Sequence, residues 1–129
     1  MQEIIHWQPF KGFSGRFYCE GVHDDYEGFR IIMRHDDKEQ THLRLKFEDV
    51  LFYQNTDEGN FLNPPPYLGD FNFPHPFYVI ENSKLVQDFH QLSSGTYQDD
   101  VITHFAIYSA NDCIDILTLS DPVAEILGI

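Results

Sequence analysis

The sequence predicts an α+β fold: an antiparallel β-meander with one crossing helix, a C-terminal β-hairpin and a short terminal helix. Three observations predict it. In the first half, short runs alternate between apolar and charged residues, which is typical of strands with one buried face. Residues 83–93 instead repeat their apolar residues at helical spacing, and two β-rich runs near the C-terminus enclose a turn. We expect one domain over residues 1–129, because a chain of this length can bury a core without disulfides.

The meander should consist of four strands. Runs 16–23, 29–34 and 43–47 carry the alternation, which is regular in 43–47, where Leu or Phe stands at every second position and Arg or Lys between them. The segments between these runs are rich in Asp and Gly, which favour turns. A fourth strand is expected at 49–54, where most residues are apolar.

Residues 60–76 should interrupt the sheet, because they contain several prolines and proline has no N–H to donate to a neighbouring strand. A loop of this length in a compact domain is either functional or mobile. Its aromatic residues, among them Tyr67 and Phe71, favour a loop that packs down and covers the body of the domain. The alternative is a loop that binds a ligand or partner.

Regular structure should resume with a short strand at 77–80. A helix is expected at 83–93, where apolar residues recur at intervals of three and four. Asn82 or Ser83 is suited to cap its start, and Gly95 stands just beyond its end.

Two β-rich runs, 102–108 and 113–119, are joined by a short polar segment and predict a hairpin. Asp121 and Pro122 then favour the start of a last helix, since proline is well tolerated in a first helical turn. The residues of this helix expected to face inward are Val123, Ile126 and Leu127.

Positive charge stops after Lys84. Seven carboxylates and no Lys or Arg follow it, and the whole chain has a formal net charge of −13 with an isoelectric point near 4.6. A field of this sign repels nucleic acid and anionic membranes and attracts basic proteins. We therefore expect a basic protein partner, no nucleic acid and no membrane.

The acidic residues of the second half are expected at turns and element ends, where a partner could reach them. Asp115 falls within a β-rich run, and alternation places it opposite Ile114 and Ile116, on the open face or at an edge of the sheet. Charge should mainly speed the encounter, while aromatic side chains supply most of the affinity. The candidate partner-binding residues are Asp99, Asp100, Asp112, Asp115, Asp121, Glu125, Tyr67, Phe71 and Tyr97.

The sequence carries no catalytic, cofactor-binding or metal-binding signature, so we expect none of these sites. The tripeptide His-Asp-Asp occurs at 23–25 and at 35–37, which could indicate metal ligands. The two copies are expected in successive turns, at opposite ends of a strand about 20 Å long, which is too far apart for a shared metal site. His90 and His104 are interpreted as structural histidines with satisfied hydrogen bonds.

The cellular compartment follows from what the chain lacks. The first residues show neither a basic segment nor an apolar run of the kind that directs secretion. No apolar stretch approaches the ~20 residues that cross a bilayer. Cys19 and Cys113 are more plausible as two free thiols than as a disulfide. We expect a cytoplasmic protein.

Several runs suggest a family. Residues 81–85, 102–105 and 111–117, together with Phe89 and the segment 50–59, resemble small acidic bacterial proteins of the immunity type, which accompany polymorphic or contact-dependent toxins. The resemblance implies a non-enzymatic inhibitor that covers its toxin, commonly a basic nuclease.

Two other classes of function stay open. The aromatic content and the long 60–76 loop are also compatible with a small-molecule-binding or enzymatic domain that has an apolar pocket under this loop. A self-associating subunit, with strands rich in Tyr and Phe at a dimer edge, is the third possibility. The oligomeric state is left open.

Overall fold

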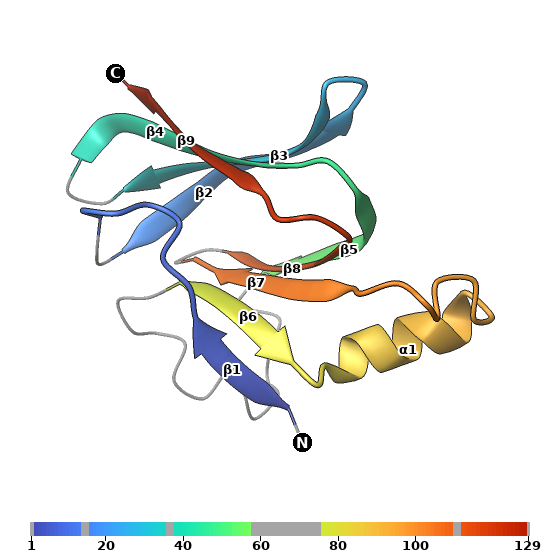
Figure 1. The fold of residues 1–129 in the computed structure, drawn as a ribbon. Coiled ribbons are helices and arrows are strands. Elements are labelled where there is room, and N and C mark those ends of the chain that lie inside the picture. The colour runs from blue at the N-terminus through green and yellow to red at the C-terminus, as the bar shows by residue number, and fades with distance from the viewer. Residues whose placement is uncertain (1, 14–15, 36–37, 58–75, 110–111, 129) are drawn as a thin grey trace.

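The structure is a computed structural model that describes residues 2–13, 16–35, 38–57, 76–109 and 112–128. These residues form strands and a single helix (Figure 1). The elements are β1 (Glu3–His6), β2 (Phe17–Asp25), β3 (Gly28–His35), β4 (Lys38–Phe47), β5 (Val50–Asp57), β6 (Phe77–Glu81), α1 (Lys84–Leu92), β7 (Thr103–Tyr108), β8 (Asp112–Thr118) and β9 (Val123–Gly128).

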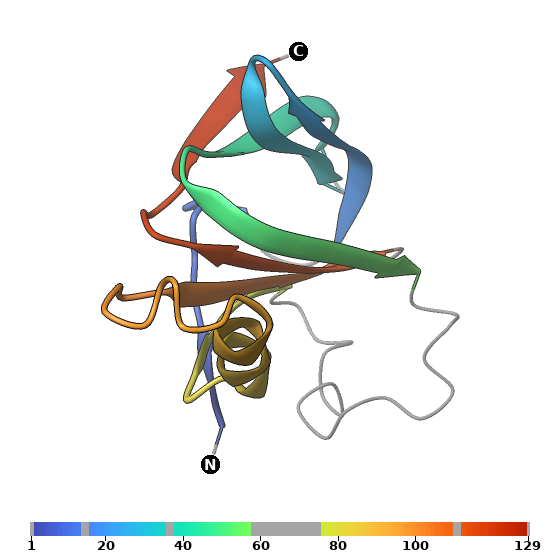
Figure 2. The ribbon, with the colours of Figure 1, turned by 90° about the vertical axis from the view of Figure 1, so that its right-hand side faces the viewer.

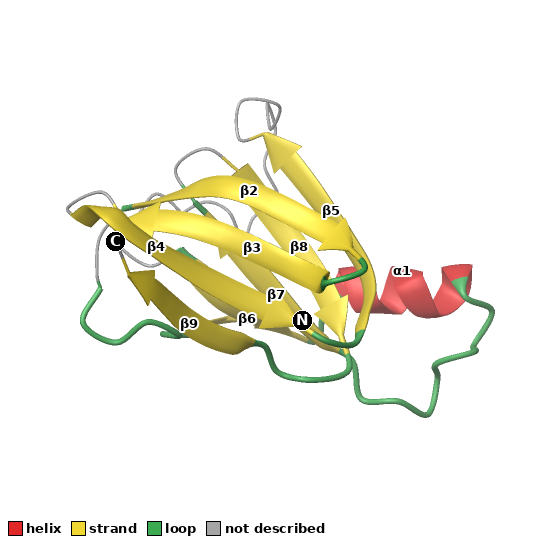
Figure 3. Ribbon diagram, turned by 90° about the horizontal axis from the view of Figure 1, so that it is seen from above, coloured by secondary structure: helices red, strands yellow, loops and turns green. Residues whose placement is uncertain are grey.

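The strands build two antiparallel sheets that pack face to face (Figure 2). One sheet has the order β2-β3-β4-β9 and the other the order β1-β6-β7-β8-β5. Figure 3 shows the four-stranded sheet lying over the five-stranded one, with α1 to one side. The architecture is therefore a mostly antiparallel β-sandwich with one helix, and the α+β prediction holds only in this broad sense.

The meander is shorter than the sequence predicted. β2, β3 and β4 pair in order, but the fourth expected strand, β5, pairs with β8 in the other sheet. The chain changes sheets between Phe47, which ends β4, and Val50, which begins β5. An apolar run does not show which strand it will pair with, so the sequence analysis expected β5 in the same sheet as β2, β3 and β4.

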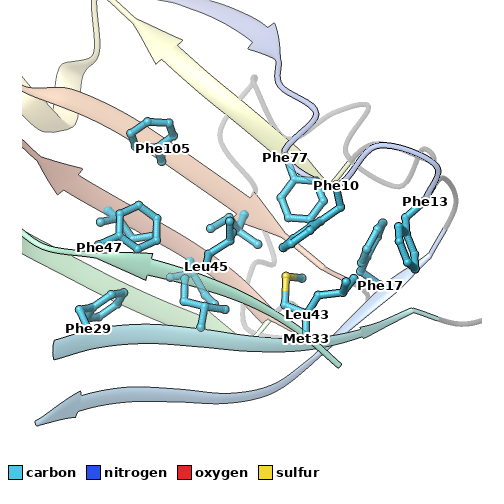
Figure 4. Packing of buried hydrophobic residues seen from close by; sticks show 14 residues of the cluster. Phe10, Phe13, Phe17, Phe29, Met33, Leu43, Leu45, Phe47, Phe77 and Phe105 are labelled. Carbon is cyan, nitrogen blue, oxygen red and sulfur yellow. The ribbon is translucent and has the colours of Figure 1, made fainter. Parts of the chain in front are cut away.

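The core lies between the inner faces of the two sheets. In β3, Phe29, Ile31 and Met33 are buried while the residues between them are half-buried, as period-two alternation requires. Aromatic rings join the sheets, with 5.8 Å between the ring centres of Phe47 and Phe105 (Figure 4). Large side chains from both sheets thus exclude water from the centre of the sandwich.

The helix α1 begins where the sequence placed it. Ser83 is its N-cap, and the Ser83 hydroxyl accepts a hydrogen bond from the Val86 N–H at 3.1 Å. Gly95 follows the helix with φ +76°, and its N–H donates to the His90 carbonyl at 3.0 Å. Among the described residues, no helix is long and apolar enough to cross a membrane.

The predicted terminal helix is wrong, since these residues form the strand β9. Val123, Ile126 and Leu127, expected to face inward on a helix, are instead all exposed. β9 pairs with β4, and the Glu125 carboxylate accepts from the Arg44 guanidinium at 2.7 Å. Pairing with β4 gives the segment backbone hydrogen bonds along its length, whereas so short an isolated helix would be marginal.

One strand was missed. β1 has only four residues and shows no alternation that would reveal it. It pairs with β6, where Ile5 stands opposite Val79, and it forms one edge of the five-stranded sheet. Its presence explains why the N-terminal residues lie beside a segment more than seventy positions away (Figure 1).

Candidate functional site

A chain of buried polar side chains lies on the outer face of the five-stranded sheet. Asp115 on β8 stands directly opposite Ala106 on β7. Alanine leaves room for the carboxylate, and His104 and Tyr108, two positions to either side of Ala106, lie diagonally across from it. Asp115, His104 and Tyr108 are only 2–3% exposed.

Short hydrogen bonds connect these side chains. Asp115 Oδ1 accepts from the Tyr108 hydroxyl at 2.7 Å and lies 2.7 Å from His104 Nε2. Gln54 on β5 donates to Asp115 Oδ2 at 3.4 Å. A carboxylate can only accept, so the His104 Nε2–H donates to Asp115. The Ser83 hydroxyl is hydrogen-bonded to His104 Nδ1 at 2.7 Å.

The order Ser83–His104–Asp115 has the components of a nucleophilic triad, but the geometry favours a structural role. Ser83 is 5% exposed. Its hydroxyl is hydrogen-bonded to His104 and accepts from the N–H of Val86, so it serves as the helix cap. A triad serine is also hydrogen-bonded to its histidine, so the structural role is indicated by the burial of Ser83 and by its bond to the helix backbone. The network instead ties the start of α1 to the sheet.

A hollow of about 520 Å³ opens beside this network, at the start of α1. Its wall includes Ser83, Val86, Gln87 and Thr103. The neighbouring Lys84 N–H donates to the side-chain oxygen of Gln2, at 2.6 Å. The N-terminal segment thus supplies an acceptor for one of the N–H groups at the start of α1. Ser83 is the member of the network that borders this hollow, and Glu81 is the one charged residue in its lining.

The outer face was only partly predictable. Asp115 does lie on the other face of β8 from Ile114 and Ile116, as the alternation indicated. The prediction that a partner can reach its side chain is wrong, because Asp115 is buried. The helix α1 packs on the same face, where the rings of Phe52 and Phe89 lie 6.2 Å apart. The pairing of β7 with β8 brings His104 and Asp115 together, and their spacing in the sequence does not reveal this register. His104 is a structural histidine, as expected.

The other acidic candidates differ in exposure. Asp99, Asp100 and Asp121 are exposed. Asp112 is half-buried at the start of β8, while Asp121 follows its end, so these two lie at opposite ends of the strand. Glu125 is half-buried and paired with Arg44. The carboxylates therefore do not gather in a single cluster.

The aromatic candidates fall in two groups. Tyr97 is half-buried, and its ring lies 5.6 Å from that of Phe89 on α1. Tyr67 and Phe71 lie outside the described residues, as does the proposed pocket under the 60–76 loop. Within the described ranges, no group of three or more His, Cys, Asp or Glu side chains could hold a metal ion.

Both cysteines are free thiols, and we predict that Cys19 reacts slowly with alkylating agents. Burial, with a contribution from Asp112, raises the pKa of Cys19 from 9.0 to about 12. Below pH 9 its reactive thiolate is therefore about a thousandfold rarer than that of an ordinary thiol. The measurement is iodoacetamide labelling at pH 8, followed by mass spectrometry, for native and urea-unfolded protein. Equal native and unfolded rates would contradict the prediction.

The same shift has a consequence for stability. The raised pKa means that the folded protein keeps the Cys19 proton that the unfolded chain loses above pH 9. This contribution to stability is fully present below pH 9 and is lost as the pH rises toward 12.

A comparison of the chain with protein-family models, with curated proteins and with solved structures finds no match, so its function has to be inferred from its own geometry.

Proposed function

We propose that this chain is a non-enzymatic binding protein that covers a basic site on a partner protein, as an immunity protein covers its toxin. The observation that carries the proposal is a surface after α1 that combines exposed carboxylates with exposed apolar side chains. We use the name post-helix surface for the exposed side chains of Leu92, Asp99, Asp100 and Val101 in the segment 92–101.

The apolar part of the post-helix surface is unusually open. Leu92 is 80% exposed and Val101 is 86% exposed. An interface needs such side chains, because desolvated apolar anchors supply most of the binding energy while charges at the rim guide the encounter. Asp99 and Asp100 stand immediately before Val101 and provide that rim.

The post-helix surface is also held in place. Successive backbone hydrogen bonds close turns between Ser93 and Asp100, among them the bond from the Asp100 N–H to the Tyr97 carbonyl at 3.0 Å. The ring of Tyr97 packs on Phe89, which packs on Phe52 of the sheet. A surface fixed before binding loses less conformational entropy when a partner docks.

The sign of the charge selects the class of partner. With a net charge of −13, the molecule repels nucleic acid and attracts proteins rich in Lys and Arg. A nuclease presents such residues where it contacts phosphates. A toxin of that kind fits the charge, and so does the resemblance to immunity-type proteins.

We predict that replacing Asp99 and Asp100 with Asn slows association with the partner about threefold to tenfold at low salt. Removing two carboxylates weakens the attraction before contact, so the rate should also depend less on salt. The partner is first captured from a lysate of the native source with the tagged protein. Association rates are then measured at two ionic strengths.

The matched control is the pair Asp24→Asn and Glu48→Gln, which removes the same charge from two exposed positions, one on β2 and one in the turn between β4 and β5. This control should retain most of the association rate. If both double variants change the rate and its salt dependence equally, net charge alone governs the encounter, and the post-helix surface is not the contact.

A further inference from the structure

β9 is an edge strand of one sheet, and β1, which pairs with β6, is an edge strand of the other (Figure 1). On β9, Ile126 stands opposite the fully buried Leu43 and shares its inward-facing side, yet it is 58% exposed. On β1, Ile5 stands opposite Val79 on the core side and is 41% exposed. Both edge strands therefore have a core-facing side chain that is exposed to solvent.

A hollow of about 450 Å³ lies where Trp7, which follows β1, comes near Asp121 and Pro122, which precede β9. Its lining consists of Trp7, Val79, Thr103, Phe105, Asp121 and Pro122. Trp7 is held by its neighbours, since its ring lies 4.8 Å from that of Phe105 and 6.0 Å from that of Phe77. The hollow therefore combines an oriented indole, apolar walls and a carboxylate.

This combination matches one kind of ligand. An indole face attracts cations, and tryptophan does so more strongly than the other aromatic residues. The carboxylate of Asp121 adds a charge-assisted hydrogen bond, and apolar walls suit the methylene stem of a lysine or arginine side chain. A neutral apolar ligand would gain nothing from the Asp121 carboxylate, and an anionic ligand would be repelled by it.

A segment of the partner that pairs with β9 would present such a side chain to the hollow. β9 is an edge strand, and an edge offers N–H and C=O groups to an extended segment of another chain. A segment paired along β9 would point every second side chain toward the inner face of the sandwich. Asp121 and Pro122 directly precede β9, so the hollow lies at the start of this edge.

We propose that the hollow between Trp7 and Asp121 binds a lysine or arginine side chain on an extended segment of the partner protein. The proposal rests on the proposed function, because a basic partner is what supplies this side chain. It adds a second contact region, formed by the hollow and the edge of β9, to the post-helix surface.

The test uses Trp7 as its own reporter, because it is the only tryptophan of the chain. A pentapeptide with a central arginine flanked by valine and threonine is titrated to millimolar concentration against the full chain at low salt, and tryptophan fluorescence is recorded. The matching peptide carries citrulline, which has nearly the same shape and no charge. The arginine peptide should change the fluorescence saturably, and the citrulline peptide should bind at least fivefold more weakly.

Variants locate the binding. Asp121→Asn should weaken the arginine peptide about fivefold, whereas Asp24→Asn, which removes the same charge elsewhere, should leave its affinity unchanged. Equal affinities for the two peptides, equal effects of the two substitutions, or no saturable response would overturn the proposal. None of these outcomes changes the result of the association-rate measurement on the Asp99 and Asp100 variant. Failure of this site is therefore distinguishable from failure of the proposed function.

Discussion

Replacing Asp115 with Ala should lower the free energy of unfolding by about 2–5 kcal/mol, because it leaves two buried donors without an acceptor at about 1–3 kcal/mol each. The carboxylate accepts from Tyr108 and His104 at 2.7 Å each, and it is 3% exposed. Without it, a hydroxyl and an imidazole N–H would be buried with no acceptor. The Ser83 hydroxyl would lose its oriented partner as well, which loosens the start of α1.

Urea unfolding, followed by circular dichroism, measures this loss. Asp121→Ala is the matched control, since it removes the same carboxylate from an exposed position and should change stability by no more than about 0.5 kcal/mol. A double-mutant cycle with His104→Ala should show that the two losses are not additive. A loss below about 1 kcal/mol for Asp115→Ala would mean that water reaches the network and replaces its hydrogen bonds.

Replacing Phe47 with Ala should cost about 3–5 kcal/mol, as is usual for a large aromatic side chain in a core. Phe47 is 1% exposed and contacts rings on both sheets, with its ring centre 5.7 Å from that of Phe29 and 5.8 Å from that of Phe105. Its removal leaves a cavity between the sheets that neither backbone can close. The loss combines the lost transfer free energy with the unfilled volume.

The same unfolding experiment tests this prediction with two companions. Phe47→Leu keeps most of the volume and should cost clearly less than Phe47→Ala. Tyr26→Ala removes an aromatic side chain that is 96% exposed and should be close to neutral. If Phe47→Ala were as mild as Tyr26→Ala, the two sheets would not depend on this residue for their packing.

The elements that could be predicted are those whose signals are local. Alternation revealed β3 because one face of the strand is buried and the other is half-buried, and this difference is visible within its eight residues. The start of α1 was visible because Ser83 caps it with its own side chain. The hairpin of β7 and β8 was visible because both strands adjoin one turn.

The features that could not be predicted depend on partners far away in the sequence. The segment of β9 has apolar residues at spacings that a helix would also accept, and only the pairing with β4 selects the strand. Asp115 is buried beside Gln54, His104 and Tyr108, which come from two other strands. Trp7 and Asp121 line one hollow although more than a hundred positions separate them. Local patterns contain none of this information.

The pairing of β4 with β9 also bears on how fast the protein folds. Arg44 and Glu125, joined across these strands, are 81 positions apart. Chains dominated by such distant contacts fold slowly, in milliseconds to seconds, because a long loop must close before any contact compensates for its lost entropy. Until β9 arrives, β4 is the exposed edge of a three-stranded sheet with Leu43 and Leu45 along it. As long as β9 is undocked, this edge is open to pairing with another chain, which favours aggregation.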